Sequence, residues 1–277
     1  MTGVDGKQII LDDPSGNPVE LFEPIIQEAR LDPRAQPNRL KTDQKRGRVE
    51  SSPGIGTRNE KSLHAALKQW YARADDQLEA KVDGFIVDIV RGDQLIEIQT
   101  RNLAAIRRKL RTLLEHHPVR LVYPIAKEKW IVRTTKSGKK IIGRRKSPKV
   151  GRLSDLFGEL VSIPELINHK NFALEVVLVQ EEEIRRVDGR GSWRRRGQSI
   201  HDHELLQVLE TVSFEKKKDL LRFLPADLEQ PFSNHDLAQR TGNSIYAVRQ
   251  MTYCLKKMGV IDQVGKKGNT FLFQIAA

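Results

Sequence analysis

The stretch VDIVRGDQLIEIQ, residues 87–99, decides the fold that this sequence predicts. Two runs of aliphatic and β-branched residues flank Gly92 and Asp93, and a Gly-Asp pair between two such runs is typical of a β-hairpin turn. Pairing outward from that two-residue turn puts Asp88 directly opposite Glu97. We therefore expect their Cβ atoms about 4.5–5.5 Å apart on one face of the hairpin.

Gln99 shares the face of Asp88 and Glu97, because side chains alternate along a strand. The opposite face takes five apolar residues that can pack against helices: Phe85, Val87, Ile89, Ile96 and Ile98. Two carboxylates that face each other repel, and a proton or a cation normally lies between them. A divalent cation such as Mg²⁺ or Mn²⁺ prefers oxygen ligands and can activate a water molecule that attacks a phosphodiester. The alternative is a polar, solvent-facing side of an antiparallel hairpin.

The residues on both sides of the hairpin predict helices and a buried strand. Residues 60–74 and residues 102–116 place apolar side chains at the spacing of amphipathic helices. Thr100 or Asn102 can cap the second helix, whose buried stripe is Leu103, Ile106, Leu110 and Leu113. Three strands are expected around these helices, at residues 81–90, 94–100 and 119–125.

The remaining parts of the chain predict mixed structure. A second hairpin is expected to turn at Ser137 and Gly138, between residues 130–133 and 140–143. Other expected elements are helices at residues 153–160, 164–168 and 213–223, and a strand at residues 172–180. Residues 1–59 are rich in Pro, Gly, Asp, Arg and Gln, so we expect a largely flexible arm with one short helix at residues 18–29.

The C-terminal block predicts helix, turn, helix, strand, loop and strand in that order. Ser233 can cap a first helix, Ser244 opens a second, longer helix, and Gly259 ends it. Four apolar residues of the longer helix are expected to face inward: Val248, Met251, Leu255 and Met258. Runs typical of strands at residues 260–264 and 270–275 flank a basic, glycine-rich loop. This order of elements resembles the winged helix-turn-helix family.

The resemblance to a winged helix-turn-helix implies DNA contact through the second helix and the loop between the strands. The exposed side of that helix, expected in the major groove, consists of Ser244, Tyr246, Ala247, Arg249, Gln250 and Tyr253. Lys266 and Lys267 of the loop are expected to contact phosphate or the minor groove. A winged helix that contacts protein is the alternative, because a fold does not determine a function.

The order of elements around the first hairpin resembles the core of the PD-(D/E)XK, or restriction-endonuclease-like, nuclease superfamily. The resemblance covers roughly residues 60–126 and implies an α/β fold with an αβββαβ core. It also implies metal ligands at Asp88, at Glu97 and at the main-chain carbonyl of Ile98. Glu60 matches an acid that many members of the superfamily bring to the metal through a water molecule.

Gln99 stands where the superfamily has a lysine that orients or activates water and stabilises developing charge. An amide carries no charge, although some restriction enzymes of the superfamily have glutamine there. Lys109, on the following helix, is an alternative source of the cation. Asp83 is an alternative to Asp88 as the strand acid, but its opposite parity would require a bulge near the glycine that follows it.

The charge of the chain indicates a polyanionic partner. The sequence contains 48 Lys and Arg residues against 36 Asp and Glu residues, a formal net charge of +12. Such a positive surface attracts polyanions over long range, and nucleic acid is the expected partner. The cations concentrate in two segments, one with Arg144, Arg145, Lys146 and Lys149 and the other with Arg194 and Arg195 beside Trp193. We expect phosphate contacts from both segments, with solvated surface runs as the alternative.

Several further features narrow the class of protein. The single cysteine, Cys254, excludes an internal disulfide and a multi-cysteine zinc site, and is expected in a helix. His201, Asp202 and His203 are expected at a loop-to-helix junction rather than in a metal site, and His64 as a packing or surface residue. No apolar run reaches the roughly 18 residues that span a bilayer, and no secretory signal is recognised. We therefore expect a cytoplasmic protein without a membrane partner.

These patterns predict three segments: a flexible arm at residues 1–58, a nuclease-like domain with a basic insertion at residues 59–205, and a winged helix-turn-helix domain at residues 206–277. The predicted function is that of a DNA endonuclease that depends on Mg²⁺ or Mn²⁺ and is targeted by the winged helix. The alternatives are a non-catalytic DNA-binding or regulatory protein on a degenerate nuclease fold, and the endonuclease subunit of a transposase-like system. Expected partners are DNA, a second copy of the chain in a homodimer, and companion proteins of a mobile-element or defence system.

Overall fold

The computed structural model describes residues 7–12, 18–23 and 62–276 of the chain, which divides into two compact units, residues 1–52 and 53–277. In the first unit, β1 (Lys7–Asp12) pairs antiparallel with β2 (Pro18–Glu23). The helix expected at residues 18–29 is therefore wrong over its first six residues, which form this strand. The β-branched residues of β1 favour a strand conformation, so β1 can pair with residues 18–23. Proline is tolerated at the first position of a strand.

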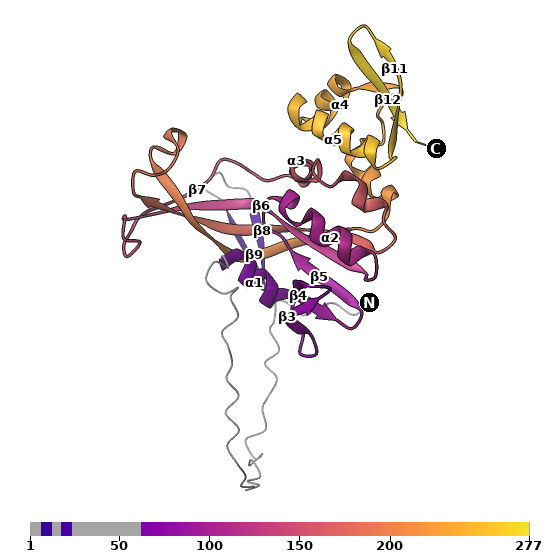
Figure 1. The fold of residues 1–277 in the computed structure, drawn as a ribbon. Helices are drawn as coiled ribbons and strands as arrows, with labels where there is room; N and C mark the ends of the chain where they lie inside the picture. The colour runs from indigo at the N-terminus through magenta and orange to yellow at the C-terminus, as the bar shows by residue number, and fades with distance from the viewer. Residues whose placement is uncertain (1–6, 13–17, 24–61, 277) are drawn as a thin grey trace, which may run out of the picture. The chain divides into compact units, whose positions relative to one another are not determined.

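The second unit is built on a mixed seven-stranded sheet (Figure 1). Its strand order is β3 (Gln77–Val82), β4 (Phe85–Arg91), β5 (Gln94–Ile98), β6 (Val119–Thr134), β8 (Phe172–Val187) and β9 (Gln198–Phe214). β5, β6 and β8 run parallel to one another, whereas the other pairs are antiparallel. The seventh strand, β7 (Ile141–Lys146), pairs with β6 beyond the end of β5.

The predicted register of the first hairpin is confirmed where the strands pair. Arg91 lies opposite Gln94, and Ile89 lies opposite Ile96. The single strand expected at residues 81–90 is wrong, because the chain turns at Asp83 and Gly84, whose φ angles are 48° and 83°. Residues on both sides of this turn form β3 and β4, so two strands occur where the sequence pattern indicated one.

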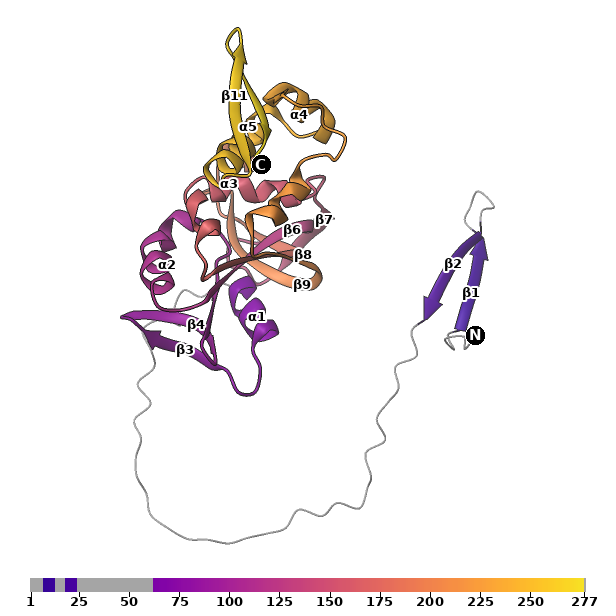
Figure 2. The same ribbon diagram turned by 90° about the vertical axis from the view of Figure 1, so that its right-hand side faces the viewer.

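Helices cover both faces of the sheet (Figure 2). α1 (Ser62–Tyr71) packs its buried leucines against Ile89 and Ile98 on one face, and α2 (Arg107–Leu114) covers the other. Val87 packs in the core under α2, whereas Ile89 packs under α1. The strict alternation predicted for this strand, which put both residues on one face, is therefore wrong around Asp88.

The helix expected at residues 102–116 forms as a 3₁₀ turn, η1 (Leu103–Ile106), that leads into α2. Its predicted stripe is confirmed, since three of the four residues are fully buried and Ile106 packs against the same core. The predicted cap is wrong for Asn102, which adopts a left-handed φ of 53° and makes no side-chain cap bond. The elements of this part of the chain therefore follow the order α1, β3, β4, β5, α2, β6.

β6 and β8 are longer than the sequence pattern indicated, and a bulge interrupts the alternation of β6. β6 joins the two runs expected at residues 119–125 and 130–133 across a register shift between Ala126 and Glu128, and the predicted hairpin of β6 with β7 is confirmed. β8 likewise extends past the run expected at residues 172–180. β9 was not expected, and it contains three register shifts against β8.

β9 corrects two further expectations. The helix predicted at residues 213–223 starts instead as the end of β9 and continues as η5 (Lys217–Phe223). His201, Asp202 and His203 lie within β9 and not at a loop-to-helix junction. The strand also runs through the predicted domain boundary between residues 205 and 206.

The C-terminal block forms the predicted helices and strands, α4 (Asn234–Thr241), α5 (Ile245–Lys257), β11 (Ile261–Lys267) and β12 (Thr270–Ile275). A short strand that was not predicted, β10 (Phe232–Ser233), precedes them. The strands form a sheet of order β10, β12, β11. The predicted cap at Ser233 is confirmed, because its hydroxyl oxygen accepts hydrogen bonds from the amides of His235 and Asp236. Gly242 and Gly259 end the two helices with φ angles of 63° and 68°.

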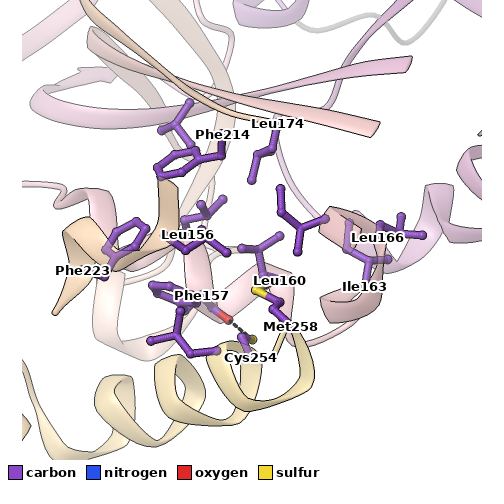
Figure 3. Packing of buried hydrophobic residues seen from close by; sticks show 14 of the residues in the cluster. Leu156, Phe157, Leu160, Ile163, Leu166, Leu174, Phe214, Phe223, Cys254 and Met258 are labelled. Atoms are coloured by element: carbon purple, nitrogen blue, oxygen red, sulfur yellow. Dashed lines mark hydrogen bonds between the residues drawn. The ribbon is translucent and has the colours of Figure 1, made fainter. Parts of the chain in front are cut away.

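A layer of short helices joins the C-terminal block to the large sheet (Figure 3). It consists of η2 (Leu153–Leu156), α3 (Phe157–Leu160) and η3 (Pro164–Asn168), at the positions where helices were predicted. Cys254 and Met258 of α5 lie on one side of this layer, and Phe214 of the sheet lies on the other. Burial raises the pKa of the Cys254 thiol to about 12. None of the helices within the described part of the chain has both the length and the apolar character that crossing a membrane requires.

Phe157 is the residue on which this packing is most easily tested. Its ring is fully buried and lies 4.7 Å from the ring of Phe223, centroid to centroid. Phe157→Ala should lower the free energy of unfolding by about 3–5 kcal/mol, because the lost ring leaves a cavity between the sheet and α5. Urea unfolding followed by circular dichroism measures this loss. Trp193→Ala, at a side chain that is 83% exposed, is the control and should change the free energy by about 0.5 kcal/mol or less; equal effects of the two changes would contradict the shared core.

Candidate functional site

Asp88 lies at the fork where β4 and β5 separate. The last paired positions of the two strands are Ile89 and Ile96. Beyond them, Oδ2 of Asp88 accepts a hydrogen bond of 2.8 Å from the amide of Ile98, so that the carboxylate takes the place of the next main-chain partner. This bond explains why the strand pairing stops at Asp88 and holds its side chain beside the end of β5.

Glu97 points toward α2 and is 5% exposed. Lys109 of α2 places its Nζ atom 2.5 Å from Oε1 of Glu97 and also donates a hydrogen bond of 2.6 Å to the carbonyl of Ile86. Oε2 of Glu97 is buried and has no hydrogen-bond partner within the described residues. A buried carboxylate oxygen that is left in this state costs free energy, so a ligand for it would stabilise the site.

The two carboxyl groups have opposite pKa shifts. Burial and the neighbouring charge of Asp88 raise the pKa of Glu97 to about 7, although the ammonium of Lys109 opposes the rise. Burial also favours neutral Asp88, but the hydrogen bond and charge of His64, the Ile98 amide and the charge of Lys109 outweigh it. The pKa of Asp88 therefore lies below its ordinary value. Lys109 acts on both carboxyl groups, which is consistent with the predicted approach of Asp88 to Glu97.

His64 is a member of the site that the sequence pattern did not indicate. Its Nε2 atom lies 3.3 Å from Oδ2 of Asp88, and its side chain is 22% exposed. It reaches the fork because α1 lies across the face of the sheet beside Ile89 and Ile98. The available signal in the sequence was its place on an amphipathic helix next to the hairpin, which does not show where that helix packs.

The other predicted site residues have different positions. The side-chain amide of Gln99 donates to the carbonyls of Arg101 at 2.6 Å and Asn102 at 3.4 Å, and so is bound to its own loop. Asp83, the alternative strand acid, lies in the β3–β4 turn with Oδ2 3.0 Å from Nε2 of His117, which does not support it in the site. Glu60 lies outside the described residues. The predicted role of the Ile98 carbonyl stays a prediction.

The donor atoms at the fork fit a hard divalent cation. Mg²⁺ is commonly held by one or two carboxylates while it keeps several water molecules. Asp88 and Glu97 supply two carboxylates, and the free Oε2 of Glu97 supplies an acceptor that no described residue uses. No group of three or more His, Cys, Asp or Glu residues that could enclose a metal occurs among residues 62–276. Water molecules would therefore have to complete the coordination of a cation that these two carboxylates held.

A hollow of about 240 Å³ lies where β5 ends while β6 and β8 continue. Its wall includes Leu63 and Thr100, which are sequence neighbours of His64 and Gln99, together with Glu181 and His203. Glu181 is 5% exposed, and its Oε1 atom lies 3.0 Å from Nδ1 of His203. None of Asp88, Glu97, His64 and Lys109 lines this hollow.

The predicted basic segments lie at the extended end of the large sheet. Arg144 and Lys146 lie on β7, each within 5.3 Å of the Trp130 ring centroid and each paired with a glutamate. Arg145 is exposed, and Lys149 lines a separate cavity of about 160 Å³. The loop with Arg194 and Arg195 follows β8, and the β6–β7 loop leaves the same end of the sheet, because β6 and β8 are parallel and in register to their ends.

The exposed face of α5 is rotated from the predicted one. Tyr246 is 70% exposed and Arg249 is exposed, as expected. Ala247 and Gln250, however, are half-buried, and the Gln250 side chain lies beside Gly158 of α3. The Ser244 hydroxyl caps the helix by accepting from the amide of Ala247. Lys266 and Lys267 on β11 are exposed, as predicted for that loop region.

Ile245 and Lys256 belong to the exposed face of α5 in place of Ala247 and Gln250. The sequence pattern placed the second pair outward because it could not show that α3 covers that side. Arg152 and Ser154 reinforce this contact, since Arg152 donates to the carbonyl of Gly242 and both side chains donate to Oδ1 of Asn243.

Glu97→Gln should change the pH dependence of stability in metal-free buffer. Glu97 has an ordinary pKa of 4.5 and a pKa of about 7 in the folded protein, so between these values the folded state binds more protons and the free energy of unfolding falls as pH rises. The free energy of unfolding of the variant lacks this fall. Relative to that of wild type, it should therefore rise by roughly 1–3 kcal/mol between about pH 5 and about pH 8. Urea unfolding across this range measures the difference. The exposed Glu115→Gln is the control, and parallel curves for Glu97→Gln and wild type would refute the raised pKa.

Comparison with known proteins shows the family of the chain. The family model described as "Domain of unknown function (DUF8091)" matches residues 61–215. An uncharacterized protein of Treponema pallidum (strain Nichols) is 31% identical over 221 residues, which cover 79% of this chain and 87% of that protein. No solved structure matches the chain significantly. Because the family model spans more than half of the sequence, and the α1–β9 region that carries the fork lies within it, the chain belongs to the DUF8091 family.

Proposed function

We propose that this protein is a Mg²⁺- or Mn²⁺-dependent DNA endonuclease with a PD-(D/E)XK-like core. The observation that carries the proposal is the buried, unpartnered Oε2 of Glu97, which lies beside Asp88 at the open end of β5. Asp88 and Glu97 would hold the cation, which would satisfy that oxygen and remove the repulsion between the groups. A structural role alone gives no reason to bury a carboxylate oxygen without a partner.

The arrangement of elements supports the same proposal. The order α1, β3, β4, β5, α2, β6 agrees with the αβββαβ order of that superfamily, and the two carboxylates come from the second and third strands of the series. In the C-terminal block, α4 and α5 are followed by the β11–β12 hairpin, and the sheet order β10, β12, β11 agrees with a winged helix-turn-helix. The net charge of +12 supports DNA as the partner.

Lys109 is the residue that would take the part of the superfamily's lysine. Its ammonium lies 2.5 Å from Glu97 and acts on Asp88 as well, whereas the amide of Gln99 is bound to its own loop. When bound, a divalent cation supplies Lewis-acid activation of a water molecule and of the scissile phosphate. Lys109 would then stabilise the negative charge that develops on the phosphate oxygens. His64 would hold or move a proton at Oδ2 of Asp88.

A non-catalytic DNA-binding protein is the second candidate. The observation that favours it is the engagement of Gln99 with Arg101 and Asn102, which leaves the usual lysine position outside the fork. In that case Lys109 would only neutralise the buried Glu97. The two candidates differ in whether the fork binds a divalent cation tightly.

Plasmid cleavage in the presence of Mn²⁺ tests the proposal directly. Asp88→Asn and Glu97→Gln should each reduce cleavage at least about 100-fold, because each removes a negative ligand of the cation. DNA binding should stay within about threefold of wild type, since neither residue needs to contact the backbone. The exposed Glu115→Gln should cleave as wild type does.

Calorimetric titration with Mn²⁺ completes this test. Wild type should bind the cation, and Glu97→Gln should bind it at least about tenfold more weakly. Cleavage that survives both substitutions would sink the assignment of the site. Absence of both cleavage and cation binding in wild type would favour the non-catalytic candidate.

Lys109→Met and Gln99→Ala distinguish the two residues that could act in the lysine's place. Lys109→Met should lower the rate of cleavage at least about 100-fold, because it removes the only cation whose contact with Glu97 is seen among the described residues. Gln99→Ala should cost less than about tenfold, because its amide contacts only its own loop in the described structure. Single-turnover cleavage assays measure both rates. The reverse ranking would assign the role to Gln99.

A further inference from the structure

A groove of about 640 Å³ lies between α5 and the strands β11 and β12. Besides the buried Phe273, two exposed aromatic side chains line it, Tyr253 of α5 at 45% exposure and Phe271 of β12 at 41%. The ammonium of Lys266 lies 4.5 Å from the centroid of the Phe271 ring, so one face of that ring is left for a ligand. The volume is within the range of about 300–1,000 Å³ that groups of small-molecule size fill. Exposed aromatic rings inside a groove of this size are suited to contact flat ligands by stacking.

The polar lining of this groove favours an anion with hydrogen-bonding edges. Arg249 and Lys256 of α5 supply positive charge, and no carboxylate occurs among the described residues of the lining. Asn234, Gln263 and Asn269 supply amide groups that can both donate and accept hydrogen bonds. Aromatic faces, cations and amides together match the base, the phosphate and the base edge of a nucleotide.

A second hollow, of about 560 Å³, shares Lys256 of its lining with the first. Four further lysines line it, namely Lys170, Lys216, Lys217 and Lys257. Among its described residues, the lining contains one carboxylate, Glu215, and this group forms an ion pair of 3.7 Å with Arg120. Lysines that converge in this way repel one another, and a chain of phosphates relieves the repulsion.

We propose that the groove and the lysine hollow together bind single-stranded DNA, with bases stacked on Tyr253 and Phe271 and the backbone continuing over the lysines. A duplex presents its bases to a protein only by their edges, so it would leave the two aromatic faces unused. Ala247 and Gln250 are half-buried, and Gln250 lies beside Gly158 of α3. The face of α5 that could enter a major groove is therefore narrower than the sequence pattern predicted. The inference deepens the proposed function, on which it rests for DNA as the substrate, by assigning unpaired nucleotides to the C-terminal block.

Fluorescence anisotropy with labelled oligo(dT) of about 12 nucleotides, in EDTA to prevent cleavage, tests the stacking. Oligo(dT) should bind wild type at least about tenfold more tightly than a duplex of equal length. Tyr253→Ala and Phe271→Ala should each weaken oligo(dT) binding about tenfold or more. Trp70→Ala, which removes a 52% exposed aromatic ring of α1, is the matched control and should bind as wild type does. Thermal unfolding of each variant establishes that it is folded.

The salt dependence of binding tests the lysine hollow. Lys216→Gln combined with Lys217→Gln should reduce the slope of log affinity against log salt by about 1.4, because each lost phosphate contact on a single strand removes about 0.7. Arg73→Gln combined with Lys81→Gln, at two exposed cations elsewhere, should leave the slope unchanged. An unchanged slope in the first variant would overturn the lysine path.

Two results would overturn the assignment of unpaired nucleotides. One is a duplex affinity that equals or exceeds the oligo(dT) affinity. The other is a loss of oligo(dT) affinity on Tyr246→Ala that is as large as the losses on Tyr253→Ala and Phe271→Ala. The ring of Tyr246 is 70% exposed and does not line the groove. The proposed nuclease fails separately, because oligo(dT) binding with the expected losses but without metal-dependent cleavage refutes the nuclease and keeps the groove. Metal-dependent cleavage without these losses in oligo(dT) binding refutes the groove and keeps the nuclease.

Discussion

The parallel pairing of β6 with β8 is the constraint on which the rest of the second unit depends. The two strands stay paired from Val119 and Phe172 to Thr134 and Arg186, whereas β5 stops at Ile98. This difference in length leaves part of one edge of β6 between β5 and β7 without a strand partner. The fork, the adjacent hollow and the basic β6–β7 hairpin all result from that unequal length. A longer β5 would fill the space in which the proposed substrate lies.

The local features of the first hairpin were predictable from sequence because they depend on near neighbours. The Gly-Asp turn set the register of the paired residues, from Arg91 and Gln94 to Ile89 and Ile96. Asp88 and Glu97 lie just beyond the last pair, and the charge of Asp88 acts on Glu97. The helix stripes and the Ser233 cap depend on spacings of three or four residues and were found for the same reason. Bulged strands were harder to predict. β9 shifts register three times against β8, so its apolar residues lose the period of two by which strands are recognised.

The parts of the site that depend on tertiary packing were beyond the reach of sequence patterns. His64 was not expected at the fork, and Lys109 was named only through the family resemblance, as an alternative source of the cation. The two residues reach the fork from opposite faces of the sheet, and their spacing does not indicate how α1 and α2 are placed. The exposed face of α5 was misplaced for a similar reason, since α3 covers Gln250 from a distant part of the chain. The carboxylate pair also has a cost, because an unsatisfied buried group destabilises a protein by about 1–3 kcal/mol. Such a cost is typical of a site retained for ligand binding and not for stability.

The docking of α5 on α3 determines more than the stability of the C-terminal block. The turn before α5 is tied to the core by Arg152 and Ser154, and Cys254 and Met258 are buried against Phe157 and Leu160. Within residues 62–276, α5 packs through this helix layer onto the sheet on which Asp88 and Glu97 lie. For the proposed nuclease, DNA bound at α5 would be cut at a constant number of nucleotides from the bound segment. The packed helix layer would then act as a ruler, and its thickness would set the distance from recognition to cleavage.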